Sequence, residues 1–423
     1  MPRHVLLLLV LFASLLSPAL RAAEPGANLR ISLLTMGPGE HPFTKFGHSA
    51  IWVHDSTELR DEVYNYGTFA FDSPTLLLDS VAGKLPYWLS VQSMSGTLRA
   101  YAEQGRSLLA SELELTPAER LLLHAALREN ARPERRYYRY DYYRDNCSTR
   151  VRDIVDRVLG GQIRRLPREP ASMTYRAHTL RLVADNRLLY LGMDLAVGRE
   201  ADTPVTFWDE AWLPERLHDL FARATVDHDG RTLPLIRSEQ TLLATRFPTP
   251  RVTPPNWSAE YLAAGLAVGI WFSALGWLAA SGRRAPRAAL GASYITVGLA
   301  LGLLGCALCY LTFFSAHSAA ASNCNVLLLP PWILLLCVAG VGVMRGKPGA
   351  FISARWASVG AAVSSAGALF VHGVSQNPQA NLQELATLLP LWLGVAFSTR
   401  GLEFAAKNWR NPGGSRGQKR DDP

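Results

Sequence analysis

Cys147 is the residue whose type and setting best suit nucleophilic chemistry. Asp145 and Asn146, directly before it, are helix-capping residue types, and Gly160-Gly161 is a typical helix stop. The apolar residues between these signals share one helical face with Cys147: Val151, Ile154, Val155 and Val158. The pattern predicts a short helix with an inward-facing thiol in its first turn. There the helix dipole and free N–H groups lower a thiol pKa and can hold an oxyanion.

The alternative for Cys147 is a buried and inert side chain. A thiol nucleophile needs an imidazole to accept its proton, so one of the ten histidines should lie beside Cys147. His48 follows Gly47 at the start of a segment, 46–53, that has the composition of a strand. His41, in a nearby loop rich in Gly and Pro, is the next candidate. The sequence therefore predicts a His48–Cys147 pair, with His48 as general base.

A third polar group should orient the imidazole. Asn65 lies on the next predicted strand, 62–67, and is the candidate, although Tyr64 and Tyr66 compete with it. Strand alternation decides which of the three faces the histidine. Lys45 and Tyr142 are close enough in sequence to the pair to help stabilise charge, and their alternative is a packing or surface role.

The distribution of charge divides the chain into two parts. Of 423 residues 48% are apolar and only 18% are charged, and the deficit falls almost entirely on residues 256–398. A positive charge, a short apolar run and small residues predict a signal peptide at 1–23, with an uncleaved signal-anchor helix as the alternative. We expect an exported domain at 24–250 and a Pro-rich linker at 251–260.

The apolar half predicts a membrane domain over residues 261–398. Five stretches are candidate spans, of which the last is short and contains Pro390: 261–280, 288–315, 326–344, 356–374 and 385–398. Arg and Lys alternate between the connecting loops as expected if the first domain lies outside and the basic tail, 399–423, lies in the cytoplasm. This topology needs an odd number of spans, which favours the short fifth one.

The net charge of +8 does not indicate a nucleic-acid partner. No nucleic-acid motif is visible, and a basic tail beside a membrane more simply meets anionic lipid. No phosphate loop and no zinc-ligand spacing occur, so the sequence implies neither a cofactor nor a metal.

The order of these motifs resembles a known family. The segments 46–51, 63–71 and 140–150, followed by a membrane bundle, are similar to the Lnb-type lipoprotein N-acyltransferases. The resemblance implies an α+β fold: a circularly permuted papain-like (NlpC-type) exported domain, followed by an all-α membrane bundle of about five helices. It also implies a multi-pass protein of the bacterial inner membrane with its first domain in the periplasm.

The same resemblance implies acyl transfer through a thioester. A phospholipid acyl donor would pass its chain to Cys147, and a lipoprotein or another acceptor amine would then receive it. In the predicted outer loop, His317, Asn323 and Asn325 match the family, and Cys324 stands where the family has an aromatic residue. These three polar residues are candidates for binding lipid headgroup or acceptor, with the capping of helix ends as the alternative.

Two other functions fit the residues. The exported domain could be a papain-like peptidase or amidase that acts on cell-wall peptide, as other NlpC-type folds do. The chain could also be a non-catalytic membrane scaffold, in which case substitution of Cys147 and His48 would leave its function intact.

Overall fold

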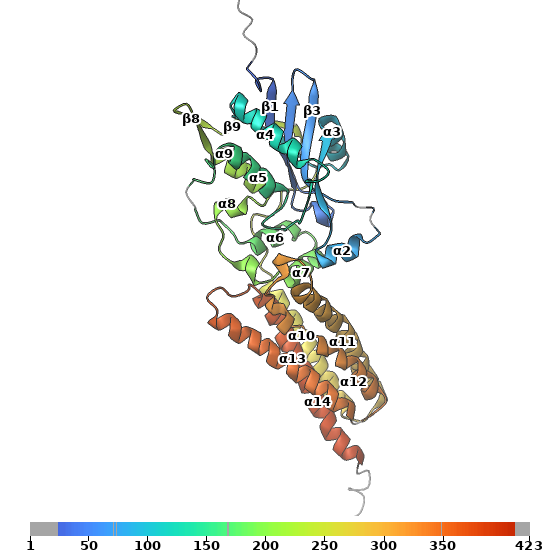
Figure 1. The fold of residues 1–423 in the computed structure, drawn as a ribbon. Helices are drawn as coiled ribbons and strands as arrows, with labels where there is room; N and C mark the ends of the chain where they lie inside the picture. The colour runs from blue at the N-terminus through green and yellow to red at the C-terminus, as the bar shows by residue number, and fades with distance from the viewer. Residues whose placement is uncertain (1–23, 71, 73, 167–168, 348, 411–423) are drawn as a thin grey trace, which may run out of the picture.

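The computed structural model describes residues 24–70, 72, 74–166, 169–347 and 349–410, with side chains through residue 400. The predicted signal peptide and residues 411–423 of the predicted tail lie outside the described residues. Figure 1 shows two parts, a sheet domain with helices on its faces and a bundle of long helices. The expected α+β domain followed by an all-helical part is therefore confirmed, while its predicted permuted papain-like character stays a prediction.

The first part is built on an antiparallel sheet. Among the described residues it has seven strands, in the order β6-β4-β3-β2-β1-β5-β9. The strands are β1 (Leu29–Met36), β2 (His48–Asp55), β3 (Arg60–Thr68), β4 (Tyr87–Ser93), β5 (Leu108–Leu113), β6 (Tyr137–Tyr138) and β9 (Ile236–Leu243). A separate ribbon pairs β7 (Thr225–His228) with β8 (Arg231–Pro234). The central strands are apolar on both faces, which is typical of a sheet covered on both sides.

Alternating side chains of the sheet enter two cores. Leu33, Ile51 and Tyr64 belong to the larger core, whereas Leu34 and Val63 belong to a smaller one on the opposite face. The larger core is covered by α4 (Pro117–Asn130), α5 (Cys147–Val158) and α9 (Pro214–Arg223). The smaller core is covered by α3 (Met94–Glu103). The predicted short helix after Asn146 is thus α5, packed against β2 and β3.

Four further helices belong to the first part: α2 (Leu76–Ala82), α6 (Tyr175–Val183), α7 (Arg187–Ala196) and α8 (Phe207–Glu210). Figure 1 shows α2 and α7 next to the ends of the long helices. Hydrogen bonds join α2 and α7 to the segment 316–325 that follows α11.

Four described segments are long and apolar enough to cross a membrane. These are α10 (Ser258–Ala279), α11 (Arg284–Phe313), the segment Cys324–Met344 with α12 (Leu335–Met344), and α13 (Gly349–Val374). The helix α10 begins inside the predicted linker. The predicted fifth span, 385–398, falls within α14 (Leu382–Arg410), which is not among the four. Gln383, Glu384 and Pro390 lower its hydropathy, so among the described residues there are four membrane-capable helices rather than the predicted five.

Candidate active site

Asn146 fixes the position of Cys147. It is the N-cap of α5, and its Oδ1 accepts hydrogen bonds from the backbone N–H groups of Ser148 (2.9 Å) and Thr149 (3.0 Å). Its Nδ2 donates to the carbonyl of Trp212 (2.9 Å), which ties the start of the helix to the loop before α9. Cys147 is therefore the first residue of α5, and it is only 8% exposed.

This cap corrects one expectation about the helix amides. Two of the first-turn N–H groups, which we expected to be free for an oxyanion, already bond to Asn146. The cap does not include the amide of Cys147 itself.

His48 and Asn65 lie together on neighbouring strands. His48 is the first residue of β2, and its Nε2 lies 3.3 Å from Asn65 Oδ1 on β3. Asn65 Nδ2 donates to the Val63 carbonyl (3.1 Å), and this bond turns the amide oxygen toward the ring. Tyr64 and Tyr66 instead pack in the larger core. Strand alternation thus separates Asn65 from its two competitors.

The imidazole of His48 is close enough to the thiol of Cys147 to change its pKa. Burial raises the pKa of Cys147, but the charge of His48 and a hydrogen bond with its ring lower that pKa. Hydrogen bonds with the Ser49 backbone and the Ser148 hydroxyl act in the same direction, and the resulting pKa is about 7. A thiol with this pKa is about half ionised at pH 7, which supplies the thiolate that a nucleophile requires.

Glycines hold the chain in the conformations that this site needs. Gly47, directly before His48, has φ +78°, and a Cβ there would lie 2.7 Å from the Met36 carbonyl oxygen. Gly67 has φ +84°, and a Cβ there would lie 3.1 Å from the ring of Tyr140 and 3.6 Å from Cys147 Cβ. Our sequence analysis missed Gly67, although its place two residues after Asn65 was the available signal.

Aromatic side chains surround the thiol, and most of them were missed as well. Tyr140 stacks on Tyr87 with ring centroids 4.2 Å apart, and Tyr87 contacts Phe69 at 5.4 Å. Burial, followed by the charge of Cys147, raises the pKa of both Tyr138 and Tyr140 well above its usual range. The environment of the sulfur is therefore apolar, with neutral phenols.

Tyr142 and Lys45 were predicted to stabilise charge at the pair. Tyr142 packs edge-on against Phe46 (5.2 Å), and its buried hydroxyl has no hydrogen-bond partner among the described residues. Lys45 forms an ion pair with Asp185 and is buried. The lysine is thus engaged with the segment between α6 and α7, and Tyr142 is part of an aromatic cluster next to the site.

The three predicted residues of the outer loop lie at the contact between the two domains. Asn323 Nδ2 donates to the carbonyl of Leu195 (2.7 Å), and Asn325 Nδ2 donates to those of Asp194 (3.2 Å) and Leu195 (3.1 Å). Both asparagines are buried. They satisfy carbonyls at the C-terminal end of α7, which corresponds to the capping role that we gave as the alternative. His317 Nε2 lies 2.6 Å from the Ser80 carbonyl of α2.

The same outer loop also touches the segment before the thiol. Arg139 donates to the Ala316 carbonyl (2.8 Å), and the Ser318 hydroxyl donates to Asp141. Asp141 in turn accepts from the backbone N–H groups of Tyr143 and Arg144, which shapes the turn leading to Asn146. The membrane domain is therefore bonded to the chain within eight residues of Cys147.

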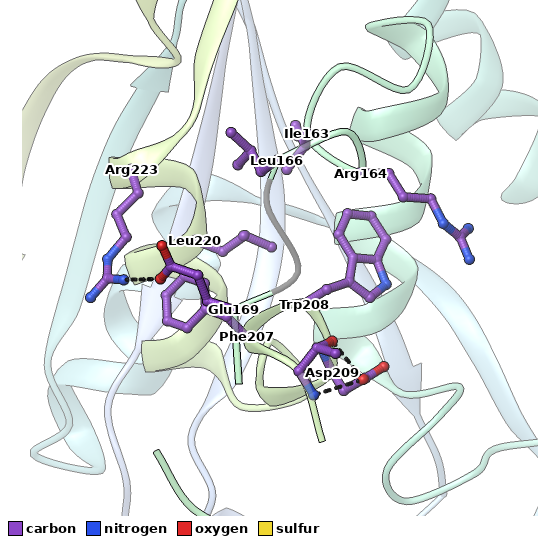
Figure 2. A pocket seen from close by; sticks show the side chains of 10 residues that line it. Ile163, Arg164, Leu166, Glu169, Phe207, Trp208, Asp209, Leu220 and Arg223 are labelled. Atoms are coloured by element: carbon purple, nitrogen blue, oxygen red, sulfur yellow. Dashed lines mark hydrogen bonds and ion pairs between the residues drawn. The ribbon is translucent and has the colours of Figure 1, made fainter. Parts of the chain in front are cut away.

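A cavity of about 380 Å³ lies elsewhere in the exported domain. Figure 2 shows the Arg223–Glu169 ion pair on one side of it and Trp208 on the other. Neither Cys147 nor His48 lines this cavity, so it is not part of the candidate active site.

Comparisons with known proteins agree with this division of the chain. A family model described as the Lnb N-terminal periplasmic domain matches residues 18–186, and one described as the Lnb transmembrane domain matches residues 266–399. No curated protein and no solved structure gives a significant match. The two domain models match in the order that the resemblance predicts, and they cover both the thiol region and the helical bundle. The chain therefore belongs to the Lnb-type family, as an inner-membrane protein with a periplasmic N-terminal domain.

Proposed function

We propose that the protein is a membrane-bound acyltransferase that works through a thioester on Cys147. The acyl donor is a phospholipid, and the acceptor is an amine, which the family assignment suggests is the N-terminus of a lipoprotein. His48 acts as general base and acid, Asn65 orients its ring, and the amide of Cys147 donates to the oxyanion.

The reaction has two acyl-transfer steps. The Cys147 thiolate attacks the ester carbonyl carbon, the C–S bond forms as the ester C–O bond breaks, and protonated His48 gives its proton to the leaving lysophospholipid oxygen. The acceptor amine then attacks the thioester carbonyl, and neutral His48 takes a proton from the nitrogen. The new C–N bond replaces the C–S bond, which regenerates the thiolate beside a protonated imidazole.

One observation carries the proposal: the imidazole of His48, whose Nε2 faces Asn65, lowers the pKa of the buried Cys147 thiol, which is about 7. With Nε2 engaged, Nδ1 is the ring nitrogen left to exchange a proton with the sulfur. The hydrogen bonds of Arg139 and Asp141 to the outer loop support a lipid substrate, because they hold this chain segment against the membrane domain.

The test is to look for an acyl adduct on Cys147. The full chain in phospholipid vesicles is incubated, digested and analysed by mass spectrometry for a long-chain acyl group on the Cys147 peptide. We expect an adduct that hydroxylamine removes, that grows when no acceptor is present, and that His48→Ala reduces strongly. Cys147→Ser should abolish transfer of the chain to an added diacylglyceryl-cysteine peptide.

A matched control separates catalysis from adventitious thiol acylation. Cys306 is an exposed cysteine on α11, so Cys306→Ser should leave transfer unchanged. Absence of any adduct on Cys147 in the wild type would contradict the proposal. Release of peptides from cell-wall fragments by the protein without lipid would favour the peptidase alternative instead.

A further inference from the structure

We propose that α2 is a membrane-docking element, whose exposed apolar face lies in the outer surface of the phospholipid bilayer beside α11. This docking goes beyond the proposed function, since it does not depend on thioester chemistry. Its consequence for lipid access to Cys147 does rest on that function.

The first observation is the composition of the exposed face of α2. Leu77 is 76% exposed and Leu78 is 72% exposed, and Val81, one turn later, is also exposed. Leu76, Asp79 and Ser80 are turned partly inward. Three exposed branched apolar side chains on one side of a seven-residue helix are costly in water and favourable in a lipid interface.

The second observation is that α2 is fastened to the end of a membrane-capable helix. His317 Nε2 donates to the Ser80 carbonyl (2.6 Å), and the Ala316 N–H donates to the Ala82 carbonyl (2.9 Å). Gly83 ends α2 with φ +67°, and a Cβ there would lie 3.0 Å from the Ala316 carbonyl carbon. The C-terminal end of α2 therefore sits directly on the residues that follow α11. Figure 1 shows α2 beside the end of the helical bundle.

The third observation indicates that lipid covers the exposed face of α2. Tyr310 and Phe313 in the last turn of α11, and Phe314 directly after it, are exposed. The helix α11 is one of the four described segments that can cross a membrane. The apolar surface that α11 turns to the lipid therefore ends at the residues on which α2 rests. Aromatic residues at this position are typical of the membrane–water interface. Lys84, exposed just after α2, is suited to meet lipid phosphates.

The position of α2 also connects the bilayer to the candidate active site. The chain leaves β3 at Thr68, just after Gly67, and reaches α2 through Phe69, which contacts Tyr87. Tyr87 stacks on Tyr140, whose ring adjoins Gly67 and the thiol. Phe69, Tyr87 and Tyr140 thus form a row of aromatic side chains that reaches the surroundings of Cys147. Docking of α2 would bring this side of the candidate active site toward the phospholipid ester groups.

The test uses a photoreactive residue, p-benzoylphenylalanine, placed at position 77 in the full chain carrying Cys147→Ser. The protein is reconstituted into vesicles of phosphatidylethanolamine and phosphatidylglycerol, irradiated and analysed for lipid adducts. Position 59 is the matched control, because Leu59 is 82% exposed but lies in the turn between β2 and β3, at the opposite end of β2 from His48. We expect several-fold more lipid adduct at 77 than at 59.

Equal lipid adducts at 77 and 59, or adducts at 77 to a second protein chain in place of lipid, would overturn the proposal. A second arm uses the otherwise wild-type chain with Leu77→Asn and Leu78→Asn. If α2 docks, these changes should reduce Cys147 acylation from vesicle lipid several-fold, while iodoacetamide labelling of Cys147 stays unchanged. Because the photocrosslink uses a variant without the thiol, it can succeed even if Cys147 acylation is never found.

Discussion

At the scale of single residues, the ionisation of Cys147 gives the most direct prediction. Its pKa of about 7 means that the thiolate fraction, and with it the rate of alkylation, rises as the pH passes through 7. In His48→Ala the charge and hydrogen bond that lower this pKa are lost, while burial still raises it. We therefore expect the midpoint of the alkylation rate to move up by more than about one pH unit.

The measurement is the pH dependence of iodoacetamide labelling of the Cys147 peptide in the full chain. Asn65→Ala serves as the comparison, because it removes the partner of His48 Nε2 without removing the imidazole. It should leave the midpoint closer to that of the wild type than His48→Ala does. Identical midpoints in wild type and His48→Ala would show that the ring does not set the ionisation of the sulfur.

The candidate site shows which side-chain contacts a sequence can predict. The helix after Asn146 follows from capping, and the nearness of His48 and Asn65 follows from strand alternation. The role of His48 as the base for Cys147 stays a prediction. The ion pair of Lys45 with Asp185 does not, because it joins residues 140 positions apart. Local patterns carry no information on such a contact.

At the scale of elements, small residues allow α10 and α14 to pack closely. A Cβ on Gly265 would lie 2.4 Å from the Thr387 carbonyl oxygen, and one on Gly269 would lie 2.6 Å from that of Pro390. These two glycines of α10 are four residues apart and so face the same partner, as in other close helix contacts in membranes. The contact explains how α14 is held against the bundle although its own hydropathy is modest.

We predict that Gly269→Ala destabilises the helical bundle. The added methyl group must push backbone apart, which typically costs about 1–3 kcal/mol. The measurement is the midpoint of thermal unfolding of the full chain in detergent. Gly367→Ala on α13 is the control, because a Cβ there meets nothing within 4 Å. A midpoint for Gly269→Ala equal to that of the control would mean that α10 and α14 are not in close contact.

The sequence predicts the long helices better than the short ones. The long apolar helices follow from composition alone, and α10 begins only three residues before its predicted start. The helices α2 and α6–α9 were not predicted. They are 4 to 10 residues long, too short for a periodic pattern to stand out, and contacts with other parts of the fold stabilise them.

At the scale of the whole molecule, buried polar bonds join the two domains. Arg176 on α6 donates to the carboxylates of Asp194 and Asp202, and these three side chains are almost fully buried. The carbonyls that follow at the end of α7 are taken by Asn323 and Asn325 from the membrane domain. Such bonds are directional, so they set how the exported domain sits on the helices as well as holding it there.

This arrangement predicts that Asn325→Ala loosens the two domains without unfolding either one. The change removes the donor to the Asp194 and Leu195 carbonyls and the acceptor for Asn381 Nδ2. The Asp194 carbonyl keeps its bond from Arg176 and the Leu195 carbonyl keeps its bond from Asn323. The buried Nδ2 of Asn381 is left unpaired, which costs about 1–3 kcal/mol. We expect faster protease cleavage in the linker before α10, residues 251–257, and slower acylation of Cys147 from vesicle lipid, with the thermal unfolding midpoint of the sheet domain nearly unchanged.

The control is Asn377→Ala, which changes an exposed asparagine in the connection between α13 and α14. It should leave both the cleavage rate and the acylation rate at wild-type values, because no buried group loses a partner. If Asn325→Ala also leaves both rates unchanged, the bonds at the end of α7 do not fix the position of the exported domain. Faster cleavage with unchanged acylation would instead show that the thiol reaches lipid without this fixed arrangement.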